Sequence, residues 1–144
     1  MSKRIILLDL NVVLDVIFDR APHVADAAAL WHACRAKKVV ALLPAHGLTT
    51  IDYLVRNAKG GDAARQALND LLAVFQVAAV DEAVIRRAAS LDWTDFEDAV
   101  VAAAAEAASC EAIVTRNPAH FVKSPVTVLS PRAAVALLSV GGSE

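Results

Sequence analysis

Short apolar runs alternate with longer helix-forming segments along the chain. Five of the runs have the length and apolar content of buried strands, and they lie at residues 4–8, 39–43, 75–80, 112–115 and 126–129. Each run is continuously apolar rather than alternating, which is typical of strands covered by helices on both faces of a parallel sheet.

The segments between the strands predict helices at residues 24–37, 45–57, 62–73, 81–90, 95–109 and 131–138. Pro22 fits the first turn of the first of these helices, and Gly60 and Gly61 end the second. Thr94 is expected to cap the Ala-rich helix that follows it. Strands separated by helices predict an α/β three-layer sandwich with a central, mainly parallel five-stranded sheet, in a single domain over residues 1–144.

Composition limits the function. The chain has 144 residues, 57% of them hydrophobic and 21% charged, which is enough apolar material for one core. The net charge of -2 excludes a strongly basic nucleic-acid-binding surface, so any contact with nucleic acid has to come from a local patch or from metal ions. We expect the two cysteines to be reduced core residues. Because no apolar run is long enough for a membrane span or a signal peptide, we expect a cytoplasmic protein without a membrane partner.

Polar residues follow the ends of two predicted strands. Asp9 ends the first strand and Asn11 follows it, while Thr115, Arg116 and Asn117 end the fourth. In parallel sheets the functional crevice lies at the carboxyl ends of the strands. The alternative interpretations are helix capping for Asp9 and an ordinary turn before a proline for Asn117.

Two further acidic groups lie on predicted helices. Asp95 and Asp98 are three residues apart and share one helix face, and Asp98 begins a stripe of small residues that we expect to be buried. Thr50 and Asp52 lie near the start of the helix at residues 45–57, where capping and helix-dipole effects are the alternative interpretation. Asp15 is interpreted as lying on the exposed side of the turn after the first strand.

Asp9, Asp98 and Asn117 lie on elements that can converge at one edge of the sheet. Carboxylates brought close together repel each other unless they are protonated or hold a cation. A cluster of oxygen ligands without Cys or His suits Mg²⁺ or Mn²⁺ rather than zinc. Such ions activate water for phosphodiester cleavage.

Four blocks together resemble the PIN domain family, in particular its VapC-like toxins. They are LLDLNVVLDV at 7–16, LTTIDYLV at 48–55, DFEDAVVAAAAEA at 95–107 and IVTRNPAHF at 113–121. The resemblance implies a Mg²⁺- or Mn²⁺-dependent ribonuclease that is the toxin of a type II toxin–antitoxin pair. Its partners would be RNA, a VapB-like antitoxin and a second copy of the chain.

The resemblance also implies roles for individual residues. Asp9, Asp98, Asp95 and Asp52 match catalytic acids, and Asp9, Asp98 and Asn117 match metal ligands. The supporting or substrate-binding residues would be Asn11, Thr50, Thr115, Arg56 and Arg116. Asn117 replaces an aspartate that many members have, and Asp52 is shorter than the usual glutamate.

Two other functions stay open at this point. The first is a PIN-like binding module without catalysis, which the exchange at Asn117 favours. The second is a phosphatase similar to the haloacid dehalogenases, in which Asp9 would attack phosphorus. That motif requires a second aspartate where this chain has Asn11.

Overall fold

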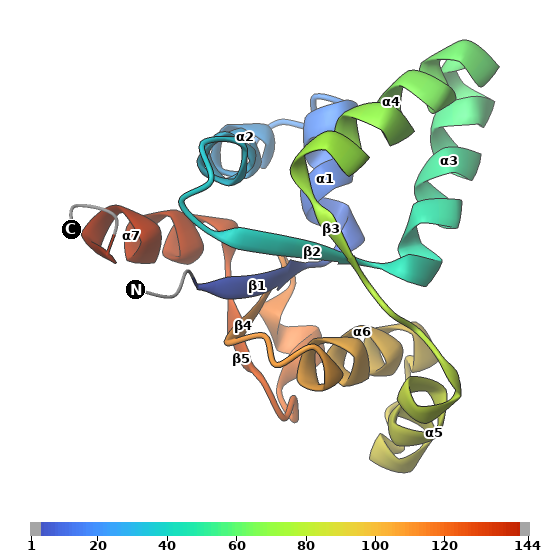
Figure 1. The fold of residues 1–144 in the computed structure, drawn as a ribbon, viewed down its shortest axis with the longest axis vertical. Helices are drawn as coiled ribbons and strands as arrows, with labels where there is room; N and C mark the ends of the chain where they lie inside the picture. The colour runs from blue at the N-terminus through green and yellow to red at the C-terminus, as the bar shows by residue number, and fades with distance from the viewer. Residues whose placement is uncertain (1–3, 142–144) are drawn as a thin grey trace.

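The computed structural model describes residues 4–141, and its centre is one sheet of five strands (Figure 1). The strands run in the order β3-β2-β1-β4-β5, and every neighbouring pair is parallel. Their bounds are β1 (Ile5–Leu8), β2 (Val40–Pro44), β3 (Gln76–Ala78), β4 (Ala112–Val114) and β5 (Thr127–Leu129). All five predicted strands are confirmed: β2 is shifted by one residue and the other four are shorter than predicted, and the sheet is wholly parallel.

Helices cover both faces of the sheet, which confirms the three-layer sandwich (Figure 1). The α-helices within residues 4–141 are α1 (Leu10–Ile17), α2 (Val24–Arg35), α3 (Ala45–Lys59), α4 (Gly61–Val74), α5 (Glu82–Leu91), α6 (Phe96–Ala107) and α7 (Pro131–Gly141). A short 3₁₀ helix, η1 (Pro118–Phe121), connects β4 towards β5. None of these helices is long and apolar enough to cross a membrane.

Alternate residues of each central strand point into two separate cores. In β1, Ile6 and Leu8 belong to the core under α1–α4 and α7, whereas Leu7 belongs to the core under α5 and α6. The side chains of successive strand residues point to opposite faces, so a strand buried on both faces has to be apolar throughout. This explains why the central strands β1, β2 and β4 are unbroken apolar runs, whereas the edge strands β3 and β5 include the polar residues Gln76 and Thr127.

The predicted turn after β1 is wrong, because residues 10–17 form helix α1. Asp9 caps this helix, and its Oδ1 accepts a hydrogen bond from the Leu10 N–H at 2.8 Å. Most of the helix is buried, although Asn11 and Asp15, four residues apart, give it one polar face. Asp15 therefore lies in the interior with 1% exposure and not on a solvent-facing turn.

Three smaller expectations at helix ends are also wrong. Helix α2 begins at Val24, so Pro22 precedes it rather than lying in its first turn. The cap of α6 is Asp95 and not Thr94, because the Asp95 carboxylate accepts the Asp98 N–H at 3.1 Å. Helix α3 begins at Ala45, which puts Thr50 in its second turn, beyond the range of capping.

Glycines shape both ends of helix α3. Gly60 ends the helix with a φ of 91°, a conformation that side chains rarely adopt. At the other end, a Cβ on Gly47 would collide with the side chain of Leu10. Gly47 therefore lets α3 approach α1 closely beside the end of β1.

Candidate active site

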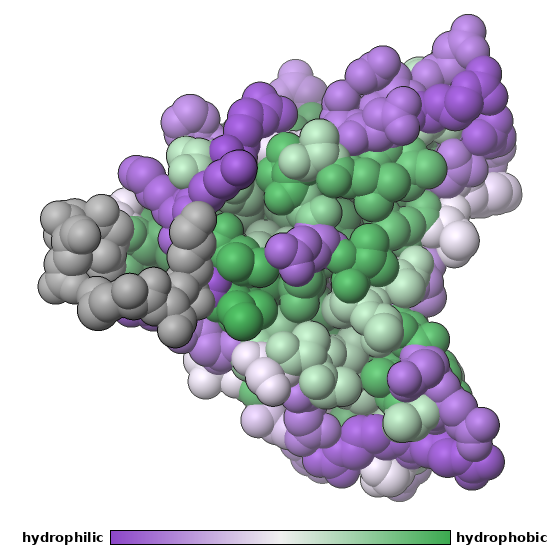
Figure 2. Space-filling model, in the orientation of Figure 1, coloured by the Kyte–Doolittle hydropathy of each residue, from purple (hydrophilic) through white to green (hydrophobic). Residues whose placement is uncertain are grey.

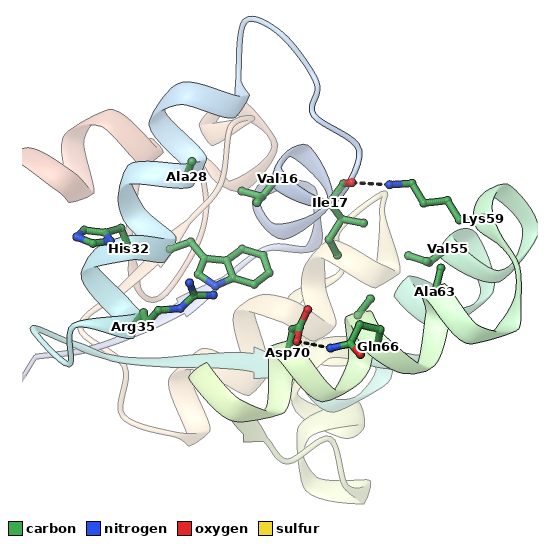
Figure 3. Close-up of a pocket in the computed structure, with 12 residues that line it drawn as sticks. Val16, Ile17, Ala28, His32, Arg35, Val55, Lys59, Ala63, Gln66 and Asp70 are labelled. Carbon is green, nitrogen blue, oxygen red and sulfur yellow. Dashed lines mark hydrogen bonds between the residues drawn. The ribbon is translucent and has the colours of Figure 1, made fainter.

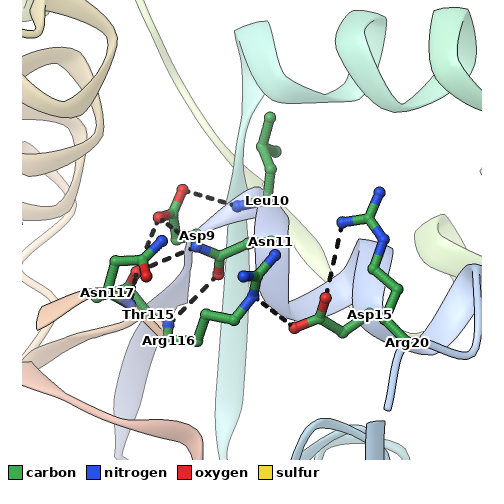
Figure 4. Close-up of polar contacts among 8 residues, drawn as sticks. All are labelled: Asp9, Leu10, Asn11, Asp15, Arg20, Thr115, Arg116 and Asn117. Atoms are coloured by element: carbon green, nitrogen blue, oxygen red, sulfur yellow. Dashed lines mark hydrogen bonds and ion pairs between the residues drawn. The ribbon is translucent and has the colours of Figure 1, made fainter. Parts of the chain in front are cut away.

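Strand order reverses between β1 and β4, and the site forms at their carboxyl ends (Figure 4). Asp9 follows β1 and Thr115 follows β4, and the Asp9 N–H donates to the Val114 carbonyl at 2.9 Å. This backbone contact continues the sheet register for one residue. It brings together two side chains that are 106 positions apart in the sequence.

The carboxylate of Asp9 is held by donors from both strand ends. Its Oδ2 accepts hydrogen bonds from the Thr115 hydroxyl at 2.9 Å and from the Asn11 amide at 3.3 Å. The Asn117 N–H in turn donates to the Thr115 hydroxyl oxygen at 3.1 Å. These bonds fix the direction of a buried carboxylate, and Figure 4 shows Asn11, Thr115 and Asn117 around it.

The acids of helix α6 act on Asp9 electrostatically. Burial raises the pKa of Asp9, the hydrogen bonds from Thr115 and Leu10 lower it, and the Asp95 carboxylate raises it further. Burial also raises the pKa of Asp98 to about 6, with added repulsion from Asp95 and Asp9. Carboxylates that repel each other in a partly buried place favour the binding of a cation.

His120 was not among the predicted site residues. Its Nδ1 lies 3.9 Å from Asp98 Oδ2, so the histidine from η1 faces the acid from α6. The interaction lowers the pKa of Asp98 but does not offset the effect of burial. Its position directly after the Asn117-Pro118 turn is the sequence signal that could have assigned it to the site.

Asp15 is a second residue whose role the sequence did not indicate. Arg116 Nε donates to Asp15 Oδ2 at 2.9 Å, and Arg20 forms a longer ion pair with the other carboxylate oxygen at 3.7 Å (Figure 4). Arg116, a candidate phosphate ligand, is thereby tied to the interior acid. Asn11 and Asp15 are four residues apart on α1, and this helical spacing was the available signal.

The predicted site residues on helix α3 lie apart from this network. On α3, the Asp52 carboxylate accepts two hydrogen bonds from Arg56, at 3.1 and 3.3 Å. Thr50 is half-buried on the same helix. The charge of Asp52 is not among the causes that shift the pKa of Asp9 or Asp98, whereas the charge of Asp95 shifts both.

The oxygen atoms of the site can be compared with the ligands that a divalent cation needs. Among residues 4–141, no three His, Cys, Asp or Glu side chains lie together closely enough to hold a metal ion. Mg²⁺ is commonly bound through one or two carboxylates while it keeps several waters. Asp9 and Asp98, with neutral oxygens from Thr115 and Asn117 beside them, fit that mode of binding.

The fold and the site thus define a parallel α/β protein with acids gathered where its strand order reverses. The family model described as PIN domain matches residues 5–119. The chain therefore belongs to the PIN domain family. This membership excludes the alternative that the chain is a phosphatase similar to the haloacid dehalogenases.

Several solved structures share this fold, and three of them illustrate the similarity. VapBC2 from Rickettsia felis, bound to a promoter DNA fragment, is 17% identical with a TM-score of 0.70, and the match covers 88% of this chain and 98% of that one. VapC20 from Mycobacterium tuberculosis, described as a sarcin-ricin loop cleaving toxin, is 20% identical with a TM-score of 0.60, covering 75% and 86%. FitAcB from Neisseria gonorrhoeae is 22% identical with a TM-score of 0.65, covering 88% and 97%. Comparison with curated proteins gave no match.

Proposed function

We propose that this PIN domain is a Mg²⁺- or Mn²⁺-dependent endoribonuclease and the toxin of a type II toxin–antitoxin pair in the cytoplasm. The observation that carries the proposal is the convergence of Asp9, Asp98 and Asp95 at the reversal of strand order. Burial, with added repulsion from Asp95 and Asp9, raises the pKa of Asp98 to about 6. The toxin role is supported by the structures of similar fold, which include toxin–antitoxin complexes.

The residues have separate tasks in this proposal. Asp9 and Asp98 would supply carboxylate oxygens to the cation, with Asn117 offering an amide oxygen and Asp95 adding negative charge. When bound, the cation would activate water and stabilise charge on the phosphoryl oxygens. Thr115 and Asn11 orient Asp9 through their hydrogen bonds.

Cleavage of a mixed pool of single-stranded RNA tests the activity. Wild type and Asp98→Asn would be compared in Mg²⁺, in Mn²⁺ and in EDTA. We expect products only with wild type and metal. A wild type that binds Mn²⁺ yet cleaves none of a pool that includes structured cellular RNA would favour the non-catalytic alternative.

A groove among helices α1 to α4 suits the antitoxin (Figure 3). It has a volume of about 530 Å³ and lies between α1 and α2 on one side and α3 and α4 on the other. Apolar side chains such as Val16 and Val55 line it, with Arg35 and Lys59 as cations among them. Trp31 also lines the groove, and its buried indole N–H has no hydrogen-bond partner among residues 4–141.

This groove matches an amphipathic antitoxin segment that carries acidic residues. Coexpression with a neighbouring antitoxin gene tests the proposal. Ala63→Arg, which would fill the groove, should release the antitoxin in a pull-down, while Arg65→Ala on the same helix should retain it. Retention by both variants would place the antitoxin elsewhere.

A second copy of the chain is the third proposed partner. Figure 2 shows a broad hydrophobic area over β2, β3 and the adjoining helices. Leu72 on α4, Val77 on the edge strand β3 and Ile85 on α5 are 51%, 44% and 39% exposed. Large exposed apolar residues on neighbouring elements favour a protein interface, so we propose a homodimer through this face.

A further inference from the structure

A second cavity opens beside the acid cluster, on the side of the molecule that carries α5, α6 and η1. Its volume is about 440 Å³, within the range of about 300–1,000 Å³ that is usual for small-molecule sites. Asp95 and Asp98 belong both to its lining and to the candidate active site. A group bound in this cavity would therefore lie next to whatever the acids act on.

Two ring systems line the cavity, Trp93 from the loop before α6 and His120 from η1. Trp93 packs edge-to-face against the buried ring of Phe121, with ring centroids 5.8 Å apart and an interplanar angle of 78°. This contact holds the indole in one orientation. Val122 lies at the rim with 79% of its surface exposed, so apolar surface is open to a ligand.

The charges of the lining exclude one ligand class and favour another. Among the described residues, the cavity is lined by three aspartates, Asp92, Asp95 and Asp98, and by one lysine, Lys123. Three carboxylates against one ammonium disfavour a phosphate or carboxylate ligand inside the cavity. They favour a flat neutral group that offers N–H donors, and Lys123 can attract an anion attached to that group.

We propose that this cavity binds one unstacked RNA base that carries an exocyclic amino group. The base would lie beside the phosphodiester that the acids and their cation cleave. The inference rests on the proposed ribonuclease function and deepens it. Proteins bind single-stranded RNA by stacking splayed bases on Trp and His side chains. Aspartate accepts a hydrogen bond from the amino group of cytosine. Uracil has one carbonyl oxygen in place of that group, and a carboxylate facing this oxygen would repel it.

The emission of Trp93 provides the test. The chain has two tryptophans, so Trp31→Phe leaves Trp93 as the only indole, and Trp93→Phe leaves Trp31 as a matched control. Single-stranded 12-mers of cytidine and of uridine would be titrated in EDTA at pH 7.5, where metal-dependent cleavage cannot occur. The two strands carry equal charge and the same sugar, so they differ only in the base.

We expect the cytidine strand to quench Trp93 with at least about fivefold higher affinity than the uridine strand, and Trp31 emission to stay constant. Trp93→Ala should weaken binding about 5- to 150-fold, the equivalent of ~1–3 kcal/mol for one stacked base. Constant Trp93 emission with both strands would overturn the base pocket. Equal or tighter binding of the uridine strand would overturn the assignment to the carboxylates.

Failure of this inference differs from failure of the proposed function. Cleavage by Trp31→Phe in Mn²⁺, together with constant Trp93 emission, would remove the pocket and leave the nuclease. Base-selective quenching in EDTA by a chain that cleaves no RNA would support the pocket and count against catalysis. Annealing the cytidine strand to its guanosine complement should abolish quenching, because paired bases cannot enter the cavity.

Discussion

Asp98→Asn should stabilise the metal-free protein at neutral pH while it removes metal binding. The Asp98 side chain is 13% exposed and faces the charges of Asp95 and Asp9. Burial and these charges raise its pKa from 3.8 to about 6. Asparagine has nearly the same shape without the charge, so the substitution removes the electrostatic cost and little packing.

The size of the effect follows from the pKa. The difference between 3.8 and about 6 corresponds to about 3 kcal/mol, at ~1.36 kcal/mol for each pKa unit. Solvent screening at the rim reduces this to roughly 1–2 kcal/mol. An acid in the first turn of a helix is favourable by about 0.3–1 kcal/mol, which the variant loses. The free energy of unfolding should therefore rise by about 1 kcal/mol.

The pH dependence gives the sign of the effect. Well below pH 3.8, Asp98 is protonated in both the folded and the unfolded chain, so its charge costs nothing. As the pH rises towards about 6, the unfolded state ionises first and the folded state loses stability relative to it. The difference between variant and wild type should thus grow from pH 4 to pH 6.5 and then stay level.

Urea unfolding followed by circular dichroism, in EDTA at pH 4 and 7.5, measures this difference. Asp62→Asn is the matched control, since Asp62 is a fully exposed acid in the first turn of α4 and should show no such gain. Adding Mn²⁺ at about 100 times its Kd should stabilise wild type alone by about 2.7 kcal/mol. Wild type should then be more stable than Asp98→Asn. A variant that is less stable than wild type at pH 7.5 in EDTA would refute the reasoning.

Three other predictions test the surroundings of the site. Thr115→Val should lower the free energy of unfolding by about 1–3 kcal/mol in urea titrations, because it removes the shorter of the two hydrogen bonds to a buried oxygen of Asp9. Thr115→Ser should retain most of the stability. Asp95→Asn keeps a good helix cap and should weaken Mn²⁺ binding about 10–100-fold in calorimetry. Asp52→Asn removes only the partner of Arg56 and should leave Mn²⁺ binding unchanged. A larger loss of affinity in Asp52→Asn would show that a further acid of the metal site lies on α3. Leu72→Glu should convert the dimer to a monomer in light scattering, and a monomeric wild type would contradict the proposed interface.

The sequence predicted the sheet and most helices because strands buried on both faces leave unbroken apolar runs. It did not predict α1, because this segment of eight residues is short and mostly apolar, and the helical spacing of Asn11 and Asp15 was interpreted as a turn. Asp9 and Thr115 could be placed together from their positions after β1 and β4. The pairing of Arg116 with Asp15 and the cavity around Trp93 depend on side-chain packing between distant segments, which spacing along the chain does not encode.

The central claim is that Asp9 and Asp98 bind a divalent cation at the carboxyl ends of β1 and β4. Electron paramagnetic resonance of Mn²⁺ titrated into wild type, Asp98→Asn and Asp52→Asn tests it most directly, because it needs no knowledge of the RNA target. We expect one Mn²⁺ site per chain in wild type and in Asp52→Asn, and affinity at least about tenfold lower in Asp98→Asn. Mn²⁺ that stays free in the presence of wild type, or binds Asp98→Asn equally well, would contradict the account.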